Sequence, residues 1–333
     1  GVFATRVFPL CLEMLLTVKD DPNWETAEDA EDETASDSAC SSDVGEAAID
    51  RLCCALGLLS TFEAVSMQVS GLTAGVPPTR GAAATAPVAS SSGNVPWQYL
   101  YAALRVVGCY VEVTTRMPDA AQLAQHRGEI AMLLLQYAPH PHARVRAAAY
   151  FAINQFFSFH GSSLQAEVRS ALFTACLRGT TRADNPAPRA RHAALGALIS
   201  FCNECPQKEL AASSGALLNF VTQALREGPV IVQESAVSVV IDLALKAPKV
   251  TIADFYNDIA PILSSLLQEV NGEEQQRLWG LGLECLAAVG ECAGPERFRA
   301  DAYAIMDSLA AIRASRESNP ERDYGDGERY QLR

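Results

Sequence analysis

Apolar side chains recur at every third or fourth position along most of this chain, a spacing typical of amphipathic α-helices. Residues 3–18 predict one such helix, ending near Lys19, and residues 46–57 and 58–69 predict two more. From Pro96 onward the helices are predicted in pairs. The first helices lie in segments that begin at Pro96, His142, Pro188, Pro229 and Glu273, and the second helices cover 119–137, 163–178, 207–226, 251–269 and 296–313.

The helix pairs form a repeat. Equivalent positions of the first helices lie about 42–47 residues apart, at Ala102, Ala148, Ala193, Ser235 and Gly282. A period of roughly 40–47 residues with two helices in each unit is the signature of HEAT and armadillo repeats. One helical pair cannot bury its apolar face alone, but stacked neighbours can. We therefore predict an all-α fold, a HEAT-repeat α-α superhelix (solenoid) of armadillo-like type.

Two irregular stretches interrupt the helical pattern. Within the HEAT helices of residues 1–69, residues 20–45 predict an acidic loop, and residues 70–95, rich in Gly, Ala, Pro, Ser and Thr, predict a low-complexity linker. Residues 317–333 are expected to form a loop and the start of a further repeat, so the chain is interpreted as an excerpt of a longer protein. The five repeats between these stretches are predicted at about 96–138, 139–180, 185–228, 229–271 and 272–316.

The negative charge is concentrated in one tract. Residues 20–50 contain twelve acidic side chains and no Lys or Arg, so they account for nearly all of the formal net charge of −13. The tract is either a solvated, solubilising loop or an anionic arm that attracts a basic partner and weakens with salt. Trp24 favours the second interpretation, because an aromatic side chain among carboxylates can anchor a partner.

Other function classes find little support. The sequence has no basic face for nucleic acid and no apolar run long enough to cross a bilayer. Cys202 and Cys205 form a lone CxxC without a second ligand pair, and none of the five histidines is followed by Glu, as HEAT-type metal hydroxylases require. We therefore expect no metal, no cofactor and no enzymatic activity, and the mostly helical cysteines indicate a reducing compartment.

Several local stretches, taken in order, resemble the importin-β (karyopherin-β) nuclear transport receptors of the importin-5 type. Their order and spacing resemble the central part of such a receptor. The first stretch, residues 20–24 (DDPNW), opens an acidic run as the acidic loop of that family does. The others are residues 47–52 (AAIDRL), 139–146 (PHPHARVR), 197–201 (ALISF) with Cys205-Pro206, and 284–286 (ECL) through 296–298 (ERF).

The resemblance implies a protein that carries basic cargo through the nuclear pore, shuttling between cytoplasm and nucleus and contacting nuclear pore proteins. The GTP form of the small GTPase Ran displaces cargo in that family, and the acidic loop is one of its contacts. The corresponding residues here are Asp20, Asp21, Trp24, Glu25, Glu28, Asp29, Glu31, Asp32 and Glu33. Candidate cargo-binding residues are Glu112, Gln155, Ser200, Asn203 and Glu204.

Two departures from the family pattern concern the cargo positions. Phe159 stands where the family pattern has Asp, and Ser200 where it has Asn. Either the cargo preference therefore differs from that of familiar members, or this face binds cargo weakly. The alternative to a transport receptor is a HEAT-repeat scaffold subunit of a non-transport complex, which would show no response to Ran. The sequence identifies neither the cargo nor the role of the 70–95 insertion.

Overall fold

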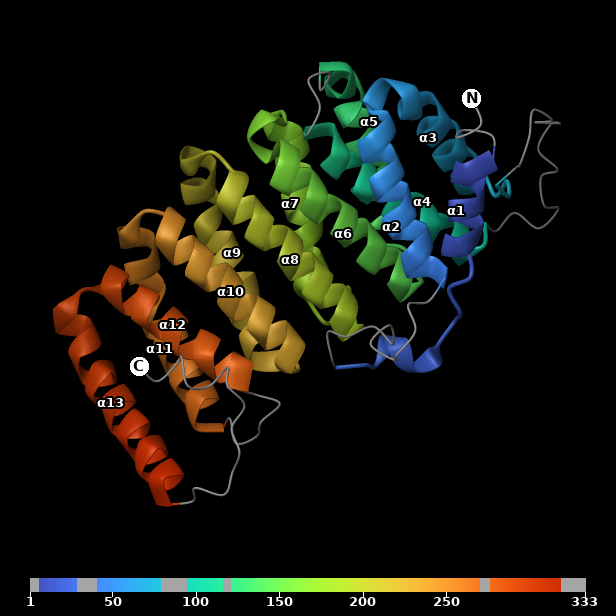
Figure 1. Ribbon diagram of the computed structural model, residues 1–333. Coiled ribbons are helices and arrows are strands. Elements are labelled where there is room, and N and C mark those ends of the chain that lie inside the picture. Colours follow the sequence, from blue (N-terminus) through green and yellow to red (C-terminus); the bar gives the residue numbers. More distant parts are fainter. Residues whose placement is uncertain (1–5, 29–40, 79–94, 116–120, 270–275, 319–333) are drawn as a thin grey trace. The chain divides into compact units, whose positions relative to one another are not determined.

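The computed structural model describes residues 6–28, 41–78, 95–115, 121–269 and 276–318, and within these ranges it contains helices and no strand. Two short 3₁₀ turns, η2 (Pro22–Glu25) and η4 (Gly161–Ser163), accompany the α-helices (Figure 1). The α-helices are α1 (Phe8–Leu15), α2 (Ser41–Leu56), α3 (Leu58–Thr73), α4 (Trp97–Thr115), α5 (Ala121–Tyr137), α6 (Ala143–His160), α7 (Ala166–Thr180), α8 (Pro188–Glu204), α9 (Gln207–Glu227), α10 (Val230–Lys246), α11 (Lys249–Glu269), α12 (Gln276–Ala293) and α13 (Pro295–Ser318).

The paired helices predicted from residue 96 onward are all present, with ends within a few residues of the predicted ones. The differences lie nearer the N-terminus. Helix α1 ends at Leu15 rather than near Lys19, and α2 begins at Ser41, inside the stretch predicted as acidic loop. Helix α3 continues to Thr73, four residues into the predicted linker. The predicted boundaries of the five repeats stay predictions.

A glycine ends helix α3. Gly75 has a φ of 79°, a left-handed conformation that glycine adopts without steric cost. The Gly75 N–H donates to the Leu72 carbonyl at 3.0 Å, and the Val76 N–H donates to the Gly71 carbonyl at 2.8 Å. These two bonds are those of a Schellman motif, which satisfies carbonyls that the helix end would leave unpaired.

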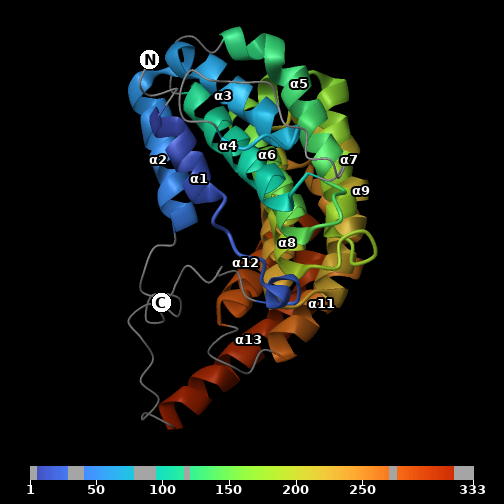
Figure 2. The ribbon, with the colours of Figure 1, turned by 90° about the vertical axis from the view of Figure 1, so that its right-hand side faces the viewer.

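The chain forms two compact units. The first unit comprises Gly1–Pro206 and Glu227–Ser235. In it α4, α6 and α8 lie side by side in one layer, while α5 and α7 pack beside each other and against α6 and α8 respectively (Figures 1 and 2). Ala143 at the start of α6 lies in one cluster with Ala187 and Ala190 at the start of α8, and Ser158 near the end of α6 is hydrogen-bonded to Ser200 near the end of α8, so these first helices run parallel.

Small and aromatic side chains alternate in this layer. Ala148, Ala149 and Ala194 are buried and allow α6 and α8 to approach closely. The Phe201 ring of α8 lies 5.5 Å from the Phe157 ring and 4.4 Å from the Phe173 ring, between centroids. Since the face toward the neighbouring helices is apolar, each helix pair is stabilised mainly by the next pair in the stack.

The second unit comprises Gln207–Arg226 and Ala236–Arg333. Helix α12 packs against α11 and α13, with Leu278, Cys285 and Val289 fully or almost fully buried. Among the described residues no helix combines the length and apolar character that a membrane span requires. The predicted all-α HEAT-repeat fold is confirmed by the helical pairs of the described residues.

Candidate functional site

The first residues of the acidic tract form a tight turn that directs Trp24 inward. The Asp21 carboxylate accepts a hydrogen bond from the Asn23 N–H at 2.9 Å, and Pro22 begins the 3₁₀ turn η2 with its ring-restricted φ. The Thr26 and Ala27 N–H groups then donate to the Asn23 carbonyl. As a result the Trp24 side chain points toward the chain's own helices and is only 6% exposed.

Trp24 packs where two neighbouring first helices begin. It forms a small apolar cluster with Ala143 at the start of α6 and with Ala187 and Ala190 at the start of α8. In both views of the molecule η2 lies beside the start of α8 (Figures 1 and 2). The turn is therefore held by side chains that lie more than a hundred residues further along the chain.

Two arginines cover the indole ring. The guanidinium carbon of Arg144 lies 4.9 Å from the Trp24 ring centroid, and that of Arg189 lies 5.6 Å away. Both distances are within the range of cation–π attraction, for which tryptophan is the strongest partner. Arg144 belongs to α6 and Arg189 to α8, so one ring is contacted by both helices.

His142 connects the acidic turn to helix α4. Its ring stacks on the Trp97 ring, with centroids 4.0 Å apart, and its Nε2 lies 3.5 Å from Asp20 Oδ1. Burial lowers the pKa of His142, although the Asp20 and Glu25 carboxylates act in the opposite direction. His142 thus contacts both Trp97 of α4 and Asp20 of the acidic turn.

Two further arginines lie near the acidic segment. Arg146 is buried, and its Nε donates to Asn185 Oδ1 at 2.9 Å. Burial lowers the pKa values of Arg146 and Arg191, and the nearby carboxylates Glu25 and Glu28 respectively oppose this effect. The starts of α6 and α8 thus present four arginines near residues 20–28, namely Arg144, Arg146, Arg189 and Arg191.

The carboxylates of the segment stay in contact with solvent. Asp20, Glu25 and Glu28 are exposed, and Asp21 is half-buried. Trp24, in contrast, is buried against this chain's own arginines and alanines. Its contact with Ran remains a prediction. The other predicted loop residues, Asp29, Glu31, Asp32 and Glu33, lie outside the described residues.

The candidate cargo residues occupy the other ends of the same parallel helices. Glu112 and Gln155 are half-buried near the ends of α4 and α6, while Asn203 and Glu204 are exposed at the end of α8. Ser200 is hydrogen-bonded to Ser158 at 2.8 Å and also to the Asn154 carboxamide oxygen, so its hydroxyl joins α8 to α6. The structure therefore brings these residues into one helical layer, although Ser200 serves packing as well.

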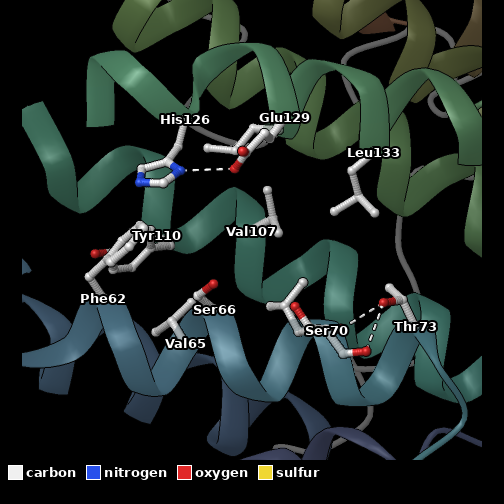
Figure 3. A pocket seen from close by; sticks show the side chains of 12 residues that line it. Phe62, Val65, Ser66, Ser70, Thr73, Val107, Tyr110, His126, Glu129 and Leu133 are labelled. Carbon is white, nitrogen blue, oxygen red and sulfur yellow. Dashed lines mark hydrogen bonds and ion pairs between the residues drawn. The ribbon is translucent and has the colours of Figure 1, made fainter. Parts of the chain in front are cut away.

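A pocket of about 190 Å³ lies between α3, α4 and α5, away from the acidic turn (Figure 3). Its wall contains Phe62, whose ring lies 4.7 Å from the His126 ring between centroids. His126 Nδ1 in turn lies 2.8 Å from the Glu129 carboxylate. The remaining lining is largely aliphatic and hydroxylic, which suits an apolar side chain better than a reacting group.

The sequence reasoning missed the arginines that hold Trp24. A signal was present, since both first helices begin with the same spacing of arginines, in Ala143-Arg144-Val145-Arg146 and in Pro188-Arg189-Ala190-Arg191. A matched Arg-x-Arg in two consecutive repeats, together with a strongly acidic stretch elsewhere in the chain, indicates electrostatic pairing between them.

The comparison with protein families supports the sequence interpretation. A family model described as importin repeat matches residues 1–60. This segment contains α1, the acidic turn and α2. The match and the fold together confirm the predicted resemblance to the importin-β family.

The solved structures with similar folds include those of the yeast karyopherin Kap121p. Kap121p bound to Pho4p superposes with a TM-score of 0.77 at 19% identity, covering 99% of this chain and 28% of that chain. Kap121p bound to RanGTP gives a TM-score of 0.75 at 18% identity, and Kap121p bound to Nup53p gives 0.76 at 19%, with the same coverage. This chain thus spans less than a third of the length of those karyopherins and shares their fold.

Proposed function

We propose that this chain is a segment of a nuclear import receptor that binds basic protein cargo and Ran in its GTP form. Such a receptor shuttles between cytoplasm and nucleus, contacts nuclear pore proteins on the way, acts by binding alone and needs no cofactor. The importin repeat that contains the acidic turn carries this proposal. The fold shared with Kap121p, which has been crystallised with RanGTP and with other proteins, supports it.

The Ran interaction is assigned to the exposed carboxylates of the acidic segment. Asp20, Glu25 and Glu28 are turned to solvent while Trp24 holds the segment in place. A partner with a basic patch would gain association rate from these charges, and the gain would decrease as salt screens them. The cargo interaction is assigned to the layer of α4, α6 and α8, where Glu112 and Glu204 can attract basic side chains.

Binding of the full-length protein to Ran in both nucleotide states tests the proposal. We expect clear preference for the GTP form, and about tenfold weaker binding at low salt when Asp20, Glu25 and Glu28 are changed to Asn, Gln and Gln. A matched control removes three exposed carboxylates elsewhere, with Glu63→Gln, Glu167→Gln and Asp258→Asn. Equal affinity for both nucleotide states would instead favour a scaffold subunit.

A further inference from the structure

Trp24 is the point at which the acidic segment is attached to the rest of the first unit. The Trp24 residue is only 6% exposed, while Asp20, Glu25 and Glu28 on either side of it are exposed. The acidic tract offers the indole only small apolar neighbours, Pro22 and Ala27. The ring therefore buries its surface on the alanines that begin α6 and α8.

The indole ring is the centre of this attachment. The guanidinium groups of Arg144 and Arg189 lie over the indole at 4.9 Å and 5.6 Å, and both arginine residues are at most 8% exposed. These cation–π contacts join the indole to both helices, and Asp20, Glu25 and Glu28 of the same segment are exposed to solvent.

We propose that Trp24 is a positioning residue that holds the acidic segment at the starts of α6 and α8 and thereby prearranges its carboxylates for a basic partner. The partner half of this inference rests on the proposed function. Without the anchor, residues 20–28 would have to be ordered when the partner binds, and this ordering would cost affinity without removing a single charge. The role predicts that loss of Trp24 weakens binding but keeps its dependence on salt.

Charge and position can be separated with three variants of the full-length protein. Trp24→Ala removes the anchor, Trp24→Phe keeps a smaller ring, and Asn23→Ala changes an exposed side chain of the same turn and serves as the control. The first readout is hydrogen exchange without any partner. The Thr26 and Ala27 amides, bonded to the Asn23 carbonyl, should exchange at least tenfold faster in Trp24→Ala and less so in Trp24→Phe, while Asn23→Ala stays as wild type.

The second readout is the affinity for GTP-loaded Ran across a salt series. We expect about tenfold weaker binding for Trp24→Ala with the slope of log Kd against log salt unchanged, whereas neutralising Asp20, Glu25 and Glu28 should reduce that slope. Unchanged amide exchange in Trp24→Ala would overturn the anchoring role of Trp24, whether or not the affinity for Ran changes. If amide exchange is faster in Trp24→Ala but the wild-type protein does not bind Ran, the anchoring role of Trp24 is supported. The proposed function and the partner half of this inference are then both wrong.

Discussion

The Arg105 guanidinium binds the carboxylate of Glu46 with two of its nitrogens, and this pair joins helix α4 to helix α2. The Nε–Oε2 distance is 2.8 Å, and about a fifth of each side chain is exposed. The guanidinium also lies 3.8 Å from the Phe151 ring centroid on α6. Burial lowers the pKa of Arg105, but the Glu46 carboxylate outweighs it and the net shift is upward. One arginine thus connects three helices of the first unit.

Glu46→Gln should therefore destabilise the chain. The substitution leaves a largely buried guanidinium without its counter-charge, and we expect a loss of about 2 kcal/mol, less than for a fully buried pair because part of the pair is exposed. Thermal unfolding followed by circular dichroism measures the change. Glu63→Gln, at an exposed position of α3, is the control and should leave the midpoint unchanged.

A double variant checks the cause. Replacing both partners, with Glu46→Gln and Arg105→Met, removes the unpaired charge and should recover much of the stability that Glu46→Gln loses. If the two losses simply add, the pair is not the reason for the destabilisation.

Gly179 and Gly128 provide a matched pair of glycine substitutions. A Cβ at Gly179 would lie 2.4 Å from Cζ of Tyr150, a buried residue that has little room to move. We expect Gly179→Ala to cost about 1–3 kcal/mol, as overpacking in a core does. A Cβ at Gly128, in the interior of α5, meets nothing within 4 Å, and Gly128→Ala should stabilise by about 0.5–1 kcal/mol.

The midpoint of thermal unfolding distinguishes these two outcomes by sign. Both variants add one methyl group to a helix of the first unit, so helix propensity alone would move both midpoints upward. A higher midpoint for Gly179→Ala would contradict the close approach of Tyr150 to the helix.

The helices could be predicted because their signal is local. The helices from α5 to α12 are 15 to 21 residues long, and apolar positions recur at helical spacing along each of them. Pro188 lies in the first turn of α8, where its missing N–H costs nothing. The end of α3 was also encoded locally, in Gly75, but the composition of the following residues suggested an earlier linker. The position of this glycine would therefore have predicted the end of α3 better than the composition of the linker did.

The environment of Trp24 could not be predicted because it depends on residues distant in sequence. Whether an indole among carboxylates is free for a partner or buried is decided by Ala143, Arg144, Ala187 and Arg189, which reach it only through the stacking of the repeats. The double role of Ser200 has the same origin, since its hydrogen bonds come from Asn154 and Ser158 on the preceding first helix. Spacing predicts that the repeats stack but does not predict which side chains meet.

In the second unit Tyr256 connects α11 to α13. Its hydroxyl donates to the Asp301 carboxylate, and the Arg297 guanidinium lies 5.4 Å from its ring centroid. Burial is the main reason that the pKa of Tyr256 is raised well above its usual value, and the hydrogen bond to the Asp301 carboxylate raises it further. Tyr256→Phe removes a charge-assisted hydrogen bond and should cost about 1–2 kcal/mol.

Hydrogen exchange in α13 tests this prediction. Amides near Asp301 should exchange faster in Tyr256→Phe than in wild type. Tyr303→Phe is the control, because Tyr303 is 68% exposed on the same helix and loses the same atom. Equal protection in the two variants would show that the Tyr256 hydroxyl does not secure α13.

His160, at the end of α6, should make the stability of the first unit depend on pH. It is 4% exposed, hydrogen-bonded to the Val111 backbone, and its ring lies 5.8 Å from the Phe156 ring. Burial, reinforced by the charge of Arg127, lowers the pKa of His160 to about 4. In the unfolded chain the pKa of histidine is about 6.5.

The sign follows from proton binding. Between about pH 6.5 and pH 4 the unfolded chain holds a proton on this imidazole and the folded chain does not, so stability is present above pH 6.5 and is lost as the pH falls. Between pH 7 and pH 5 the loss from this residue should be about 2 kcal/mol. His160→Gln removes the titration but keeps a hydrogen-bond donor.

Thermal midpoints of wild type and His160→Gln at pH 5, 6 and 7 isolate the effect, because His140, His142 and the carboxylates titrate alike in both proteins. The difference between the two proteins should narrow steadily as the pH falls, since only wild type loses the contribution of this residue. Midpoints that decrease in parallel would mean that His160 is protonated in the folded chain, and the burial argument would then be wrong for this side chain.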